Sequence, residues 1–263
     1  MPRITVDAAH GSWHNDVCDG QQVWSYGGGV QSAAIAVLIA TKRLPTPDLA
    51  VIADTGREAD TTWTYLADHV RPLLYGLVEV HVAPHALSTV DLYAKNGDLL
   101  IPAFTNSGGA LRTLCSNEWK KRVVRRWLRA RGVHRATVWL GISRDEGGRM
   151  KESDVGWIIH RYPLISEVPM NRAECVQVIM DAGLPVPPRS SCWMCPYRSD
   201  AEWRTLRKDS PDGWDRAVAL DAAIRERDLG LFLHRRMVPL PKAVKDDTQA
   251  DLFDACESGY CWT

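Results

Sequence analysis

Short apolar segments with strand character alternate with helical patterns along the chain, and this alternation limits the fold more than any other feature. The predicted strands are residues 23–26, 49–53, 77–80 and 136–140, and the predicted helices are residues 32–42, 59–70, 116–131 and 171–182. Strands that alternate with helices pair in parallel, because each helix returns the chain to the same end of the sheet. The sequence therefore predicts an α/β fold with a doubly wound parallel sheet.

Three regions are expected along the 263 residues. Residues 1–20 have the composition of a loosely ordered N-terminal arm, and residues 21–205 contain the strand–helix alternation. Residues 206–263 are helical at first and then irregular, and they end in a tail that contains cysteines. We expect this last region to form an appendage on the α/β domain.

Charge and hydropathy exclude several classes of protein. Lys+Arg and Asp+Glu both number 32, so the overall charge favours no polyanionic partner, and only local patches can do so. The N-terminus lacks the apolar core of a secretory signal, and the longest apolar run, residues 33–40, is too short to span a bilayer. We expect a cytoplasmic protein with no membrane partner, in which seven cysteines do not form a disulfide framework.

Three consecutive glycines, Gly27, Gly28 and Gly29, lie between the first predicted strand and the first predicted helix. Ligands of open α/β sheets bind at such turns, where glycines let a phosphate approach the backbone and the start of the helix supplies N–H donors. The segment is neither a dinucleotide-binding fingerprint nor a Walker A loop, since no Gly-Lys-Ser follows. A tight turn without a ligand is the alternative interpretation.

Polar residues also follow two other predicted strands. Asp54, Thr55 and Gly56 come after the second strand, and they suit the edge of a nucleotide and its ribose. Asp54 taken alone is equally typical of a turn or of a helix N-cap. Arg144, with Glu146 and Arg149, follows the strand at 136–140, where it would bind phosphate or sulfate or form a surface ion pair.

Several of these segments resemble one known superfamily. Residues 25–32, SYGGGVQS, resemble the PP-loop of ATP pyrophosphatases, and residues 52–65 resemble the "DTG…ET…Y" segment of their phosphoadenosine phosphosulfate (PAPS) reductase branch. Residues 112–115, 141–149, 162–164 and 192–196 are similar to that branch's R-x-C, "G-x-R-x-x-E…R", "hYPL" and CxxCP elements. The motifs occur in the family's order, and this ordered set is more specific than any single motif.

The resemblance implies a role for each matching position. The residues expected to bind the nucleotide are Ser25, Tyr26, Gly27, Gly28, Gly29, Gln31, Ser32, Asp54, Thr55, Gly56, Gly141 and Arg144. The nucleotide would be ATP, or PAPS or its APS relative, and Mg²⁺ is expected beside its phosphates. Ser32 and Arg144 are the candidate catalytic residues. Because Val30 and Gln31 replace the family's charged residues, the loop has no charged side chain, so backbone N–H groups, Ser25 and Ser32 do more of the binding.

The cysteines form the second group of candidate residues. Cys192 and Cys195 make a CxxC motif that can hold one metal centre, and the resemblance brings Cys115 to the same site. These three would ligate a [4Fe–4S] cluster, with Cys256 or Cys261 as the fourth ligand or with one iron left open. Structural zinc is the alternative metal, and free thiols near a turn are the third interpretation.

A strongly basic helical segment lies between residues 118 and 135. Trp119, Val123 and Trp127 recur at the spacing of one buried helical face. The basic residues are Lys120, Lys121, Arg122, Arg125, Arg126, Arg129, Arg131 and Arg135, with Glu118 as the only acid among them. The alternatives are a solvated helix face and a contact surface for polyphosphate or nucleic acid.

Three functional hypotheses follow. The leading one is an enzyme that adenylates an acceptor with ATP, releases pyrophosphate and supports sulfur transfer, with a nucleic acid as a possible acceptor and a protein as a possible sulfur donor. The second is a thiol-dependent reductase of PAPS or APS in which Cys261 is the nucleophile and sulfite is released. The third is a nucleotide-binding module with structural zinc and no turnover. A homo-oligomer is expected in each case.

Overall fold

The computed structural model describes residues 20–85 and 92–244, which form two compact units. The sheet unit comprises residues 20–52, 64–82 and 127–189. The thiol unit, named for the cysteines it contains, comprises residues 53–63, 83–85, 92–126 and 190–244. The thiol unit combines segments from both sides of the predicted boundary at residue 205. The N-terminal arm and the cysteine-containing tail fall outside the described residues, apart from Gly20, so the regions drawn from sequence stay a prediction.

A five-stranded sheet with the order β3-β2-β1-β5-β6 forms the centre of the sheet unit. The strands are β1 (Gln21–Ser25), β2 (Leu49–Ala53), β3 (Val80–Ala83), β5 (Ala136–Leu140) and β6 (Ile158–Arg161). β1 pairs in parallel with β2 and with β5, and β5 pairs in parallel with β6. The predicted α/β fold with a doubly wound parallel sheet is therefore confirmed.

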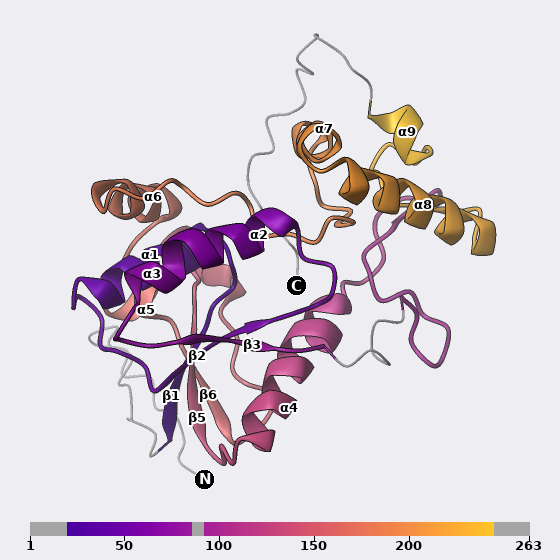
Figure 1. Cartoon of the computed structure of the whole chain (residues 1–263). Coiled ribbons are helices and arrows are strands. Elements are labelled where there is room, and N and C mark those ends of the chain that lie inside the picture. Colours follow the sequence, from indigo (N-terminus) through magenta and orange to yellow (C-terminus); the bar gives the residue numbers. More distant parts are fainter. Residues whose placement is uncertain (1–19, 86–91, 245–263) are drawn as a thin grey trace. The chain divides into compact units, whose positions relative to one another are not determined.

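Helices cover both faces of this sheet. α1 (Val30–Ala40) contacts α3 (Arg71–Leu73), α5 (Pro163–Ser166) and α6 (Arg172–Asp181). Figure 1 shows α1 and α3 on one face, and the end of α4 (Arg122–Ala130) that belongs to the sheet unit on the other. Among the helices of the described residues, none is long and apolar enough to cross a membrane.

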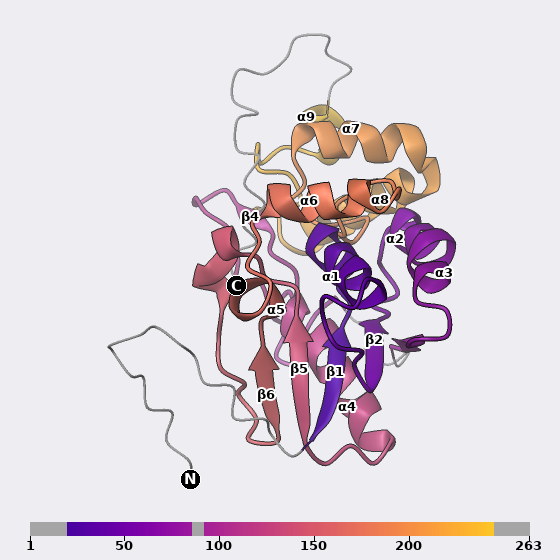
Figure 2. The same ribbon diagram turned by 90° about the vertical axis from the view of Figure 1, so that its left-hand side faces the viewer.

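α1 is buried almost all round, as its sequence predicts. Ten of its residues, from Val30 to Ile39, are buried, because the helix lies between the sheet and neighbouring helices (Figure 2). It begins two residues before the predicted position, since Gly29 adopts an extended conformation and serves as the N-cap. Leu38 and Ile39 accept the backbone hydrogen bonds that end the helix.

Most predicted elements are present, with differences at their ends. The helix predicted at 59–70 comprises α2 (Asp60–Tyr65), a π-helical stretch (Leu66–Val70) and α3. The strand predicted at 77–80 begins three residues later, because the backbone N–H groups of Leu77 and Val78 still bond to the helix at Leu74. The helix predicted from Ser116 consists of a π-helical stretch (Ser116–Lys121) and α4. Its N-cap is Cys115, and within the described residues no side-chain hydrogen bond caps the helix there.

Helices and one small antiparallel sheet form the thiol unit. The elements are α7 (Asp200–Asp209), α8 (Pro211–Arg227), α9 (Leu240–Ala243), and the paired strands β4 (Phe104–Thr105) and β7 (Leu231–Phe232). Asp221, which is fully buried on α8, accepts hydrogen bonds from the backbone N–H groups of Leu233 and Leu240 and pairs with Arg225. This carboxylate therefore ties the irregular segment after α8 to the helix.

Candidate functional site

The loop after β1 forms a closed turn at the start of α1. Gly28 has a φ of 77°, which a residue with a side chain rarely adopts. The backbone N–H of Gly27 donates to Ser32 Oγ at 2.9 Å. The first N–H groups of α1 have no acceptor within the helix, so they remain available to an anion. The predicted phosphate-binding segment therefore has the backbone conformation of a cradle.

A second loop, which follows β5, meets this cradle. A Cβ atom on Gly141 would lie 3.2 Å from Ser32 Oγ and 3.3 Å from the backbone nitrogen of Ser32. The sheet explains this approach, because Ser25 and Leu140, the last residues of β1 and β5, are partners in the register. The chain crosses from β1 to β2 in one direction and from β5 to β6 in the other. The two loops thus meet where the strand order reverses, which is where open α/β sheets bind ligands.

Gln31 is the centre of a polar network at this meeting point. Its side chain is buried and donates from Nε2 to Glu146 Oε2 at 3.0 Å and to Ser143 Oγ at 3.3 Å. Arg172 Nη1 donates to Gln31 Oε1 at 3.4 Å, and Arg149 pairs with Glu146 at 2.7 Å. The loop itself lacks charged side chains, but neighbouring segments supply an acid and two arginines.

Sequence reasoning missed Ser143 and Arg172. Arg172 is 141 residues from Gln31 along the chain, in the first turn of α6, and no motif links the two. The capping box of Asn171 and Glu174 fixes the start of α6 and so the position of the arginine. The capping box was the only sequence signal near this residue.

Two predicted residues have mainly structural contacts. The side chain of Arg144 is 52% exposed and pairs with Glu174 at 3.2 Å, which is the ion-pair alternative drawn from the sequence. Tyr26 is buried and packs edge-on against Trp24, and burial raises the pKa of its phenol. Within the described residues its hydroxyl has no hydrogen-bond partner. The backbone of Tyr26, which bonds to Val51, thus holds the loop in place.

The segment after β2 belongs to the thiol unit. Asp54 Oδ1 accepts a hydrogen bond from the backbone of Gly56 at 2.7 Å, so the carboxylate closes a turn. Gly56 has a φ of 66°. Thr55 is buried, and its hydroxyl donates to Glu58 Oε1 at 3.3 Å. The turn interpretation of Asp54 fits these contacts, and its role in nucleotide binding stays a prediction.

A charged pair, of which only the carboxylate is buried, lies beside the CxxC motif. Glu58, whose side chain is 3% exposed, pairs through Oε1 with Lys120 Nζ at 3.1 Å. The carboxylate raises the pKa of Lys120, and burial together with Glu58 raises the pKa of Cys192 to about 12. Thr55 Oγ1 lies 3.8 Å from Cys192 Sγ. Burial and the nearby carboxylate thus favour the neutral form of Cys192, while Lys120 favours the thiolate.

Two of the cysteines predicted to bind metal, Cys192 and Cys115, interact electrostatically with Lys120 and raise the pKa of its ammonium group. Cys195 in turn raises the pKa of Cys192. None of the three forms a disulfide bond with another described residue. Their donor chemistry suits iron or zinc, yet within residues 20–85 and 92–244 no group of three His, Cys, Asp or Glu side chains is arranged to hold a metal ion. We therefore derive no chemical step through a cluster.

The remaining cysteines have other settings. Cys261 and Cys256 lie outside the described residues. Cys175 is fully buried in α6, where desolvation raises the pKa of its thiol to about 12. This placement agrees with a packing role.

The basic segment has a buried and an exposed side. Trp119, Val123 and Trp127 are buried, as their spacing predicts. Several of the cations already have partners: Lys120 pairs with Glu58, Arg122 pairs with Glu118, Arg129 stacks on Trp157 and Arg131 stacks on Trp127. These contacts orient the arginines while leaving most of them exposed to solvent. A contact surface for an anionic polymer stays a prediction.

Comparisons with known proteins give a limited likeness. No protein-family model and no curated protein sequence matches the chain. The structure is similar to that of PAPS reductase from Candida auris in complex with phosphate, with a TM-score of 0.44 and 14% sequence identity over 67% of this chain and 83% of that one. Because the identity and the TM-score are low, the function proposed below rests on the residues of the site.

We predict that Gly141→Ala disrupts the cradle. The new Cβ atom would lie 3.2 Å from Ser32 Oγ, which is closer than ordinary van der Waals contact, so the two loops must move apart. Binding of ATP, measured by isothermal titration calorimetry, is expected to weaken at least about tenfold, which corresponds to roughly 1.4 kcal/mol.

Gly148→Ala is the matched control, because a Cβ atom at Gly148 meets nothing within 4 Å. It should bind ATP as the unmodified protein does. Equal affinities of the two variants would contradict the importance of the close approach.

Proposed function

We propose that this chain is an enzyme that binds ATP at residues 27–32, adenylates an acceptor with release of pyrophosphate, and supports sulfur transfer. The observation that carries the proposal is the close approach of Gly141 to Ser32 at the point where the strand order reverses. Loops that meet at such a point bind nucleotides in open α/β sheets. The resemblance of residues 25–32 to the PP-loop of ATP pyrophosphatases supports adenylation with release of pyrophosphate as the reaction.

The residues of the sheet unit suit phosphate chemistry. The first N–H groups of α1 and the hydroxyl of Ser32 would donate to phosphate oxygens, and their fixed positions need no reorganisation as charge develops. Arg172 and Arg149 add positive charge beside Gln31. Glu146, which contacts Gln31, has the type of oxygen that Mg²⁺ prefers. Together these groups would hold the triphosphate while an acceptor attacks its α-phosphorus.

The thiol unit motivates the sulfur-transfer part of the proposal. Cys115 and Cys192 interact with Lys120, Cys195 interacts with Cys192, and an ammonium group stabilises anionic sulfur. The basic residues of the 118–135 segment would attract a nucleic-acid acceptor through its phosphates. Sulfur transfer and the identity of the acceptor both depend on the nucleotide chemistry proposed for the sheet unit.

We predict that Ser32→Ala lowers the rate of pyrophosphate release from ATP by about 100-fold, because removal of one preorganised donor to a developing charge has an effect of this size. The measurement is a coupled pyrophosphate assay on anaerobically purified protein. Ser166→Ala, at an exposed serine of α5, is the control and should keep full activity.

Two outcomes would contradict adenylation. An unchanged rate of pyrophosphate release in Ser32→Ala would show that the loop at residues 27–32 takes no part in the reaction. Sulfite release from PAPS without pyrophosphate release from ATP, lost in Cys261→Ala, would instead identify the reductase. Binding of ATP without either product would identify a nucleotide-binding module.

The proposed iron–sulfur cluster has its own test. Iron and sulfide analysis of anaerobic protein, together with absorbance near ~400 nm from thiolate-ligated iron, should detect a cluster that is lost in Cys192→Ser. Cys175→Ser is the control, because that thiol is fully buried in α6 and far from any CxxC motif in sequence. Stoichiometric zinc in place of iron would support the structural alternative, and protein free of both metals would refute a metal centre.

A further inference from the structure

A small hollow lies within the thiol unit, and none of the predicted site residues lines it. Its volume is about 270 Å³. The lining residues are Tyr93, Gly97, Asp98, Leu99, Leu111, Arg227, Asp228 and Leu231. Pockets for drug-sized ligands measure about 300–1,000 Å³, so this hollow suits a smaller molecule.

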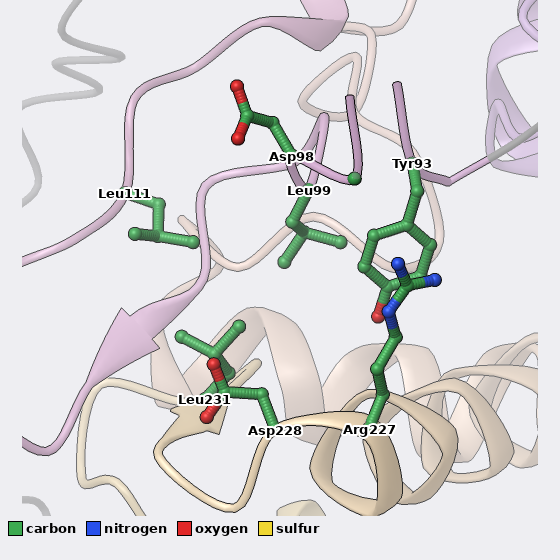
Figure 3. Close-up of a pocket in the computed structure, with 8 residues that line it drawn as sticks. Tyr93, Asp98, Leu99, Leu111, Arg227, Asp228 and Leu231 are labelled. Atoms are coloured by element: carbon green, nitrogen blue, oxygen red, sulfur yellow. The ribbon is translucent and has the colours of Figure 1, made fainter. Parts of the chain in front are cut away.

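The charged residues of the hollow are held in place by local contacts. The guanidinium of Arg227 stacks on the ring of Tyr93, 3.7 Å from its centroid (Figure 3). Asp98 Oδ2 accepts a hydrogen bond from the side chain of Asn96 at 2.8 Å. Asp228 Oδ1 accepts one from the backbone of Gly230 at 2.9 Å. The carboxylate of Asp228 closes a turn and is thereby oriented, whereas that of Asp98 is held by a neighbouring side chain.

Opposite charges line the same hollow without pairing. Among the described residues, no basic side chain forms an ion pair with Asp98 or Asp228, and no acidic side chain forms one with Arg227. One oxygen of each carboxylate and the donors of the guanidinium accordingly face no protein partner in this part of the chain. A cavity bordered by separated charges of both signs is complementary to a ligand that also has both signs.

Apolar side chains form the rest of the lining. Figure 3 shows Leu99 between Asp98 and Asp228, Leu231 beside Asp228, and Leu111 on the side of the hollow away from Arg227. Leu99 is buried and belongs to the core of the thiol unit, so this surface is rigid. An aliphatic group placed on it would leave water without displacing protein atoms.

We infer that this hollow binds a free α-amino acid with an apolar side chain. The α-carboxylate pairs with Arg227, the α-ammonium pairs with Asp228, and the side chain packs on the leucines. A nucleotide is excluded by the two carboxylates, which repel phosphate, and a polyamine is disfavoured by Arg227. The inference is independent of the function proposed for the sheet unit.

L-Leucine and two analogues test the requirement for both charges. 3-Methylbutylamine lacks only the carboxylate, and 4-methylpentanoate lacks only the ammonium. In isothermal titration calorimetry on the full chain, L-leucine should bind saturably and each analogue should bind at least about tenfold more weakly, since each loses a charge-assisted hydrogen bond. Absence of saturable binding by L-leucine, L-methionine and L-phenylalanine, or equal binding of leucine and its analogues, would overturn the inference.

Substitutions locate the site. Arg227→Met keeps an apolar stem on Tyr93 but removes the charge, and it should weaken L-leucine binding at least about tenfold. Asp228→Asn keeps the acceptor for Gly230 and should also weaken binding. Lys208→Met and Asp209→Asn, at exposed positions of α7, are the matched controls and should bind normally.

Thermal unfolding of each variant checks that it is folded. Binding that is unchanged in folded Arg227→Met and Asp228→Asn would place any leucine site elsewhere and refute the inference.

Discussion

The contact between the loop after β1 and the loop after β5 determines what the sheet unit can do. Gly141 lies so close to Ser32 that a Cβ atom there would be tighter than ordinary van der Waals contact, and this approach follows directly from the parallel pairing of β1 with β5. The sheet thus places two short loops and the start of α1 at a single point. The proposed nucleotide binding, the position of Gln31 and the approach of Arg172 all depend on this arrangement.

In the network around Gln31, other segments of the chain place charged side chains beside a loop that has none of its own. Glu146 comes from the segment after β5, and Arg172 comes from the first turn of α6. Both are placed by tertiary structure. The replacement of charged residues within the loop is therefore compatible with phosphate binding, because the charged side chains come from other elements.

Much of this architecture was predictable from local patterns. The buried helix at α1 and the strands β2 and β5 follow from apolar runs bounded by glycine and turn residues, and the strand–helix alternation predicted the parallel sheet. β6 was missed because its second half, His160 and Arg161, is polar, which leaves an apolar run too short to indicate a strand. The late start of β3 reflects hydrogen bonds to the preceding helix, which periodicity does not reveal.

The candidate sites were predictable to a lesser extent, for a physical reason. Consecutive glycines and closely spaced cysteines indicate a function by their residue type and spacing alone. Residues 27–32 and the CxxC motif were therefore found from the sequence. Ser143, Arg172 and the ion pair of Glu58 with Lys120 depend on contacts between distant segments. For Asp54 the sequence suggested a nucleotide contact, whereas in the structure its carboxylate closes a turn.

The most direct test of the central claim is a crystal structure with a non-hydrolysable ATP analogue and Mg²⁺. The account predicts phosphate oxygens bonded to the backbone N–H groups at the start of α1 and to Ser32, beside Gly141. A nucleotide bound elsewhere on the chain, with the loop at 27–32 free of phosphate contacts, would contradict it.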